Sequence, residues 1–260
     1  MQKNCLMAAP TVLVFDSGLG GLTVYREIAK MRPDANYVYV ADDAFFPYGA
    51  HEQSALIARV VPLMGDLIAE HKPELVVIAC NTASVQVLAA VRERYTVPFV
   101  GTVPAIKPAC AQSKTRRIAV LGTKATVARE YTHALIREFA QGCEVTLVGS
   151  GRLAAYAEAE LAGTPVADAA IAAEIAPCFL ESGGRKTDTV VLACTHYPLL
   201  LARFEALAPW QVDWIDPAPA IARRVTELFG PPPAQKSRGS RRAVFTSGRQ
   251  PAAVAEEFAR

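Results

Sequence analysis

Short hydrophobic runs alternate with longer amphipathic segments along most of the chain. Apolar positions spaced near 3.6 residues predict helices, including residues 22–31, 52–71 and 126–139. The short runs are rich in β-branched residues and predict strands at residues 11–15, 36–41, 75–79, 97–101, 117–121, 144–148, 189–193, 212–215 and 243–246. Several of these runs are apolar at every position, as in parallel strands covered by helices on both faces. The alternation of strand and helix predicts an α/β fold.

Two pairs of segments resemble each other within the chain. Residues 75–82, Leu-Val-Val-Ile-Ala-Cys-Asn-Thr, resemble residues 189–196, Thr-Val-Val-Leu-Ala-Cys-Thr-His. Residues 12–17 have a similar counterpart in residues 118–123. Hydrophobic strands resemble one another by chance, but both members of the first pair also end in Ala-Cys followed by polar residues. The similarity therefore predicts two similar parallel-sheet α/β domains that face each other, with the active site in the cleft between them.

The first domain is expected to be discontinuous, because the boundary falls near Pro104 and the chain returns near Val212. We assign residues 1–103 and 212–260 to the first domain and residues 104–211 to the second. Residues 230–235, Gly-Pro-Pro-Pro-Ala-Gln, predict a surface loop ahead of a last strand and helix.

Composition excludes several classes of protein. With 260 residues, 52% hydrophobic and 20% charged, the chain is not largely disordered. A net charge of +2 argues against a dedicated nucleic-acid binder, and we expect the basic stretch at residues 236–242 to be a solvated loop. No apolar run approaches the roughly 20 residues of a membrane helix. The apolar start ends at residues 16–18 without a cleavage site, so we expect a first strand and a cytoplasmic protein.

The six cysteines are too sparse for a disulfide framework, and their spacing matches no zinc site. We expect four of them to fill space in the core or at the surface: Cys5, Cys110, Cys143 and Cys178. Cys80 and Cys194 differ because each directly follows a buried strand in a similar context. Burial as ordinary core residues is the alternative, but the twin contexts favour a functional role for both thiols.

Ligands of open parallel sheets bind beyond the carboxyl ends of the strands. The residues at those positions are small, polar and rich in hydroxyl groups: 16–18, 42–49, 80–82, 122–123, 150–151 and 194–196. A helix begins after each strand end, and its N-terminus favours anions and lowers a cysteine pKa from about 8.5. We therefore expect Cys80 and Cys194 to be reactive, with His196 as an acid or base beside Cys194.

Asp16 follows its strand directly and is expected to be a partly desolvated functional carboxylate, a cap of the next helix, or both. The glycines at 18, 20 and 21 do not make a dinucleotide fingerprint, since Thr23 stands at the position of the third glycine. Two thiols from facing domains predict a two-base device. One thiolate removes a proton from a carbon, and the opposite thiol returns a proton to the other face, which inverts the stereocentre without a cofactor.

Seven motifs in the chain resemble those of glutamate racemases, a branch of the cofactor-independent aspartate/glutamate racemase superfamily. They lie at residues 15–24, 47–49, 79–83, 101–104, 121–123, 193–196 and 245–248. The resemblance implies interconversion of L-glutamate and D-glutamate by two cysteines, with no cofactor and no metal. It further implies a homodimer that supplies D-glutamate for peptidoglycan synthesis.

The resemblance also implies roles for individual residues. Cys80 would serve D-glutamate with help from Asp16, and Cys194 would serve L-glutamate with help from His196 and Glu158. Ser150-Gly151 stands where the family has Cys-Pro ahead of that glutamate, so two alternatives remain: Glu160 has the role, or Glu158 is an ordinary residue of a surface helix. The residues implied in substrate binding are Asp16, Ser17, Tyr48, Gly49, Asn81, Thr82, Thr195 and His196, with Thr123 as a further candidate.

Three other functions stay open at this point. The chain could racemise a different acidic amino acid, which a panel of substrates would reveal. A Cys-His hydrolase could use Cys194 and His196, in which case Cys80→Ser would remain active. A non-catalytic binder would bind glutamate without exchanging its Cα hydrogen.

Overall fold

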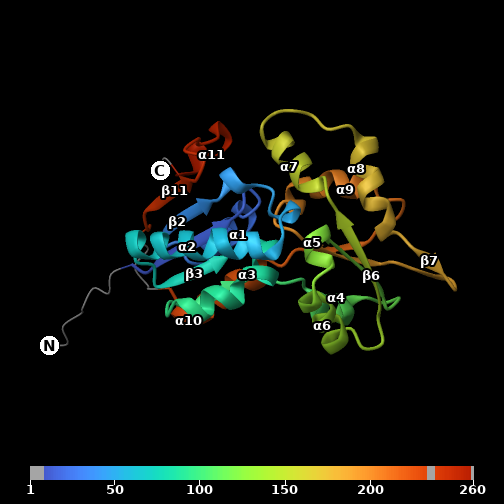
Figure 1. Ribbon diagram of the computed structural model, residues 1–260. Helices are drawn as coiled ribbons and strands as arrows, with labels where there is room; N and C mark the ends of the chain where they lie inside the picture. Colours follow the sequence, from blue (N-terminus) through green and yellow to red (C-terminus); the bar gives the residue numbers. More distant parts are fainter. Residues whose placement is uncertain (1–8, 233–237, 259–260) are drawn as a thin grey trace.

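The computed structural model describes residues 9–232 and 238–258, and it contains two parallel sheets side by side (Figure 1). The first sheet has the strand order β11-β2-β1-β3-β4, and the second has the order β10-β9-β5-β6. This arrangement confirms the predicted α/β class. Cys5, residues 233–235 of the proline-rich loop, and residues 236–237 of the basic stretch lie outside the described residues.

The first sheet is covered by helices on both faces. Its strands are β1 (Thr11–Asp16), β2 (Asn36–Ala41), β3 (Leu75–Ile78), β4 (Phe99–Gly101) and β11 (Arg241–Phe245). Its helices are α1 (Leu22–Met31), α2 (Gln53–His71), α3 (Asn81–Arg94), α10 (Ala218–Phe229) and α11 (Ala252–Phe258). Side chains alternate along β1, so Val12 and Val14 pack with α1 and α10, while Leu13 and Phe15 pack with α2 and α3. The fully apolar strand pattern follows from this double coverage.

The second sheet is built in the same way. Its strands are β5 (Arg117–Thr123), β6 (Glu144–Ser150), β9 (Thr189–Ala193) and β10 (Asp213–Ile215). Its helices are α4 (Ile106–Gln112), α5 (Lys124–Val127), α6 (Glu130–Phe139), α7 (Leu153–Leu161), α8 (Asp168–Ile175) and α9 (Leu201–Leu207). A small antiparallel hairpin of β7 (Glu181–Ser182) and β8 (Arg185–Lys186) projects from this half. Short 3₁₀ turns lie at Asp43–Phe45, Tyr48–Ala50, Ala176–Cys178 and Tyr197–Leu200.

The chain crosses back to the first sheet slightly later than residue 212. Strand β10 pairs in parallel with β9, so Asp213–Ile215 completes the second sheet. Helix α10 then packs against the first sheet through Ala218, Ile221 and Val225. We therefore infer that the second domain extends to Ile215.

The segment predicted as one helix over residues 126–139 forms two helices, α5 and α6, with a break at Ala128 and Arg129. Thr123 caps α5, because its hydroxyl accepts a hydrogen bond from the Thr126 amide at 3.0 Å. The Thr132 hydroxyl donates to the Thr126 carbonyl at 2.7 Å and stabilises the break. The helical periodicity continues across the break, so hydrophobic spacing alone did not reveal it.

No helix within residues 9–232 and 238–258 combines the length and the apolar character needed to cross a membrane.

Because the first sheet is covered on both faces, replacing a buried leucine should destabilise the protein much more than replacing an exposed one. Leu13 in β1 has no exposed surface, whereas Leu228 on α10 is 45% exposed. We expect Leu13→Ala to lower the free energy of unfolding by about 2–5 kcal/mol, because it removes buried methyl groups and leaves a cavity. Leu228→Ala should change it by less than about 0.5 kcal/mol. Chemical denaturation of both variants measures this, and equal losses would contradict the packing described here.

Candidate active site

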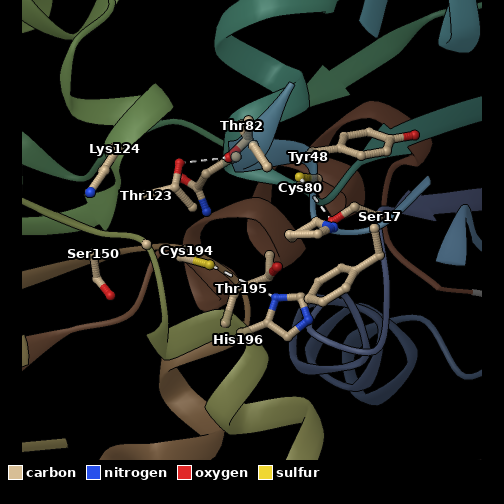
Figure 2. A pocket seen from close by; sticks show the side chains of 17 residues that line it. Ser17, Tyr48, Cys80, Thr82, Thr123, Lys124, Ser150, Cys194, Thr195 and His196 are labelled. Atoms are coloured by element: carbon tan, nitrogen blue, oxygen red, sulfur yellow. Dashed lines mark hydrogen bonds between the residues drawn. The ribbon is translucent and has the colours of Figure 1, made fainter. Parts of the chain in front are cut away.

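A cavity of about 220 Å³ lies where the carboxyl ends of the two sheets meet (Figure 2). Both domains contribute to its wall, which contains the two singled-out thiols, Cys80 and Cys194. The predicted site residues that line it are Ser17, Tyr48, Gly49, Cys80, Asn81, Thr82, Thr123, Cys194, Thr195 and His196. Asp16 and Glu158 do not line it, but both contact residues that do. The topology thus gathers residues that are far apart in the sequence into one cavity.

Cys80 lies at the start of α3, where its sulfur accepts a hydrogen bond from the Ala83 amide at 3.5 Å. The Ser17 hydroxyl lies 3.7 Å from the same sulfur. Burial raises the pKa of the Cys80 thiol well above its ordinary value, and the nearby Asp16 carboxylate raises it further. The expectation of a lowered pKa is therefore wrong for Cys80, because burial and a carboxylate outweigh the helix N-terminus.

Asp16 is fully buried at the end of β1, behind the cavity wall. One carboxylate oxygen accepts from the Gly18 amide at 3.0 Å, and the other accepts from the Thr195 hydroxyl at 3.0 Å. Burial raises the pKa of Asp16, while the nearby His196 lowers it. The cap position of α1 is Gly21, so the alternative role of Asp16 as a helix cap is wrong.

Cys194, His196 and Glu158 form a chain of contacts on the other side of the cavity. The Cys194 sulfur lies 3.9 Å from Nδ1 of His196, and Nε2 of His196 lies 2.7 Å from Oε1 of Glu158. Burial opposes charge on His196, but the hydrogen bonds to Cys194 and Glu158 outweigh it and raise the pKa of His196 to about 10. Glu160, the alternative to Glu158, instead pairs with Arg203.

The glycine turn after β1 brings the first domain against this chain of contacts. The Leu19 amide donates to Oε1 of Glu158 at 2.7 Å. A methyl group at Gly20 would lie 2.4 Å from Nδ1 of His196 and 2.6 Å from the Thr195 hydroxyl. Only a residue without a side chain allows this close approach.

A second group of contacts joins the two domains beside the cavity. The Thr82 hydroxyl of the first domain lies 3.0 Å from the Thr123 hydroxyl of the second. Thr126 lies within hydrogen-bond distance of both, at 3.2 Å from Thr82 and 2.9 Å from Thr123. Gly49 approaches Thr123 so closely that a methyl group there would lie 3.1 Å from its Cβ. Thr82, Thr123 and Gly49 are thus held in place by the domain contact.

Two of the predicted binding residues differ in what they can offer a ligand. The Tyr48 hydroxyl donates to Asp42 at 2.7 Å, and Asp42 also forms an ion pair with Arg59 at 2.6 Å. The hydroxyl of Tyr48 is therefore occupied, which leaves its ring and main chain for the cavity. By contrast, both side-chain polar atoms of Asn81 are buried without a hydrogen-bond partner in the described structure. Such unpaired atoms are costly unless a ligand or water satisfies them.

Some lining residues had no role assigned from the sequence: Phe46, Pro47, Ala50, Lys124, Ser150, Gly151 and Ala154. Phe46 is apolar and its ring lies 5.4 Å from that of His196, so no polar signal marked it. Ser150 and Gly151 were noted at a strand end, and Lys124 follows the strand end at Thr123. Position after a parallel strand was the available signal for these three. In the described part of the chain, no cluster of three or more histidine, cysteine, aspartate or glutamate side chains could hold a metal.

Comparison with known proteins places this cavity in a family. The sequence profile of Asp/Glu/Hydantoin racemases matches residues 13–225. The glutamate racemase of Sinorhizobium fredii is 54% identical over 240 residues, which cover 92% of this chain and 90% of that protein. The chain belongs to the Asp/Glu/Hydantoin racemase family. This confirms the resemblance found in the motifs, and the enzyme is an amino-acid racemase, an isomerase.

Solved structures agree with this racemase assignment. The crystal structure of Escherichia coli glutamate racemase, in complex with L-glutamate and the activator UDP-MurNAc-ala, has a TM-score of 0.86 at 39% identity. The match covers 96% of this chain and 95% of that one. Glutamate racemase RacE1 of Bacillus anthracis has a TM-score of 0.82 at 26% identity, covering 97% of this chain and 95% of that one.

The raised pKa of His196 makes a prediction about the stability of this racemase. A histidine whose pKa rises on folding stabilises the folded state fully below its unfolded pKa, near 6.5, and loses this contribution as the pH rises through about 10. We expect the difference in unfolding free energy between the wild type and His196→Gln to shrink between those pH values. Denaturation at a series of pH values measures it, and a difference independent of pH would contradict the charge assigned to His196.

Proposed function

We propose that this racemase interconverts L-glutamate and D-glutamate with Cys80 and Cys194 as its two bases. The observation that carries the proposal is that these two thiols, one from each domain, line the same cavity. The relatives described above are glutamate racemases, and one of them was crystallised with L-glutamate. A hydrolase needs one nucleophile and one base, so a second thiol from the facing domain favours racemisation over the Cys-His hydrolase.

The chemistry of the wall suits an amino acid with two carboxylates. Ser17, Asn81, Thr82 and Thr195 supply hydroxyl and amide groups next to the two thiols. These groups can donate to carboxylates without the cost of an unpaired buried charge. The unpaired amide of Asn81 adds a donor and an acceptor that a substrate would satisfy.

The proton transfers follow from the two faces of the substrate. For L-glutamate, the Cys194 thiolate takes the Cα proton, so an S–H bond forms as the C–H bond breaks. The Cys80 thiol then gives its proton to the opposite face of the carbanion and becomes the thiolate. D-Glutamate reacts by the reverse sequence, starting from the Cys80 thiolate. The two thiols exchange states in each turnover, and solvent resets them.

The buried groups around each thiol support these steps. The pKa of Cys80 is raised by burial and by Asp16, which favours the protonated thiol that would donate to the carbanion. The α-ammonium group of a bound substrate would favour the thiolate by its positive charge. His196, held by Glu158, lies 3.9 Å from Cys194 and stabilises negative charge on that sulfur. Because both thiols are buried, each of these interactions is stronger than it would be in water.

Removal of either thiol should abolish racemisation. We expect Cys80→Ser and Cys194→Ser each to lower kcat by roughly 10²- to 10⁴-fold, because each removes one of two essential proton-transfer groups. Proton NMR in D₂O without added cofactor measures both loss of the Cα–H signal and appearance of the other enantiomer. Cys110→Ser is the matched control, since Cys110 is a buried thiol outside the cavity wall. A fully active Cys80→Ser enzyme would overturn the two-base mechanism and favour the hydrolase-like site.

The single-thiol variants also test which thiol serves which enantiomer. One remaining base reaches only the hydrogen that faces it. We expect Cys194→Ser to exchange the Cα hydrogen of D-glutamate for deuterium and leave L-glutamate unchanged, with the converse for Cys80→Ser. The reverse pattern would mean that Cys80 serves L-glutamate and Cys194 serves D-glutamate. If the wild type binds glutamate but does not replace its Cα hydrogen with deuterium, the protein is a non-catalytic binder.

We also propose, from the family resemblance, that the product D-glutamate serves peptidoglycan synthesis in the cytoplasm and that the enzyme is a homodimer. Depletion of the enzyme should then create a growth requirement for D-glutamate. One chain has a mass of 27.9 kDa. Light scattering of the purified protein should give twice this mass.

A further inference from the structure

Lys124 is the one lysine in the described wall of the cavity, and this part of the wall contains no arginine. Lys124 begins α5 in the second domain, directly after Thr123 at the end of β5. In Figure 2 it lies beside Ser150, on the side of the cavity away from Ser17, Tyr48 and His196. The side chain is exposed, which places it at the cavity mouth rather than beneath the thiols.

The Lys124 side chain lies beside Gly151. A methyl group at Gly151 would lie 3.5 Å from Cε and 3.7 Å from Nζ of Lys124, so the ammonium group lies close to the Gly151 backbone. Gly151 is itself part of the cavity wall. A bulkier residue at position 151 would occupy the space next to the ammonium group.

Lys124 has no acidic partner among the described residues. None of the ion pairs formed within residues 9–232 and 238–258 includes it. The other cationic group of the wall, His196, is held by Glu158 and lies beside Cys194. Lys124 is therefore the positive charge of the described wall that remains available to a ligand.

A substrate with two carboxylates and one ammonium group carries one net negative charge. Its Cα must lie between the thiols for proton transfer, which places the α-carboxylate and α-ammonium groups near the residues that adjoin the thiols, Ser17, Asn81, Thr82 and Thr195. The side-chain carboxylate then extends toward the remaining wall. We propose that Lys124 pairs with this side-chain carboxylate at the mouth and selects a dicarboxylic amino acid over its neutral amide. This inference rests on the proposed racemisation of glutamate.

A charge at the rim of a site acts mainly on capture of the ligand and on its dependence on salt. We expect Lys124→Met to raise KM for glutamate by roughly threefold to tenfold with kcat within about twofold of the wild type. The decline of kcat/KM with added salt should also become shallower in this variant. Lys124→Arg should retain most of the affinity because it keeps the charge.

The proposed selectivity has its own readout. In the wild type, glutamine should be a weak competitive inhibitor, because its neutral amide gains nothing from Lys124. Lys124→Met should lower the ratio of the glutamine inhibition constant to the glutamate KM by about the same factor as KM rises. Lys124→Gln, which is also neutral but remains polar, should behave in the same way and gives an independent check should the methionine variant fold poorly.

Lys114→Met is the matched control. Lys114 is also exposed and belongs to the second domain, but it lies before the amino end of β5, whereas Lys124 follows the carboxyl end. The Lys114→Met substitution removes the same charge from the protein without altering the cavity wall. We expect its KM, salt dependence and glutamine ratio to match the wild type.

The outcomes separate this inference from the proposed function. An unchanged KM and an unchanged glutamine ratio in both neutral variants would overturn the role of Lys124 while wild-type racemisation still stands. A fall in kcat with unchanged KM would also overturn it, since Lys124 would then act on the reaction rather than on binding. Failure of the wild type to racemise glutamate would instead overturn the proposed function.

Discussion

The hydrogen bonds of Glu158 are the contact on which the geometry of the site depends. A single carboxylate oxygen lies 2.7 Å from His196 and accepts from the Leu19 amide at 2.7 Å. Glu158 belongs to α7 of the second domain, whereas Leu19 belongs to the turn after β1 of the first. The same interaction therefore fixes the imidazole beside Cys194 and brings the two domains into register. Charge-assisted hydrogen bonds of this kind are short and strong when they are buried.

Burial gives the cavity its chemistry as well as its shape. Cys80, Cys194, Asp16 and His196 are each at most 6% exposed, so none can be charged without support from a neighbour. The pKa of Cys80 and that of Asp16 are raised by burial, and that of His196 is raised by its hydrogen bonds. A bound zwitterion would change this balance, because it brings an ammonium group and a carboxylate next to these buried groups. The protonation states needed for turnover thus depend on the substrate itself.

Much of this arrangement could be predicted from the sequence because the fold obeys a simple rule. Buried parallel strands are apolar throughout, so the first polar residues after them, such as Ser17 and Cys80, mark the site. The break between α5 and α6 could not be predicted, since it is stabilised by the hydroxyl contact of Thr132 with the Thr126 carbonyl rather than marked by periodicity. The direction of the Cys80 pKa shift was also out of reach, because it reflects burial and a carboxylate that only the tertiary structure places nearby.

The two similar strand ends acquire different partners in the structure. After β3, Cys80 starts a long helix and lies near Asp16, a buried acid whose negative charge favours the protonated thiol. After β9, Cys194 is followed by a short 3₁₀ turn, and His196 at the start of this turn lies 3.9 Å from the sulfur with a raised pKa that favours its charged form. Cys80 therefore has a carboxyl group nearby, whereas Cys194 has an imidazole beside it. In the proposed two-base reaction each turnover would exchange the protonation states of the two thiols, so solvent would have to restore them before the next turnover in the same direction.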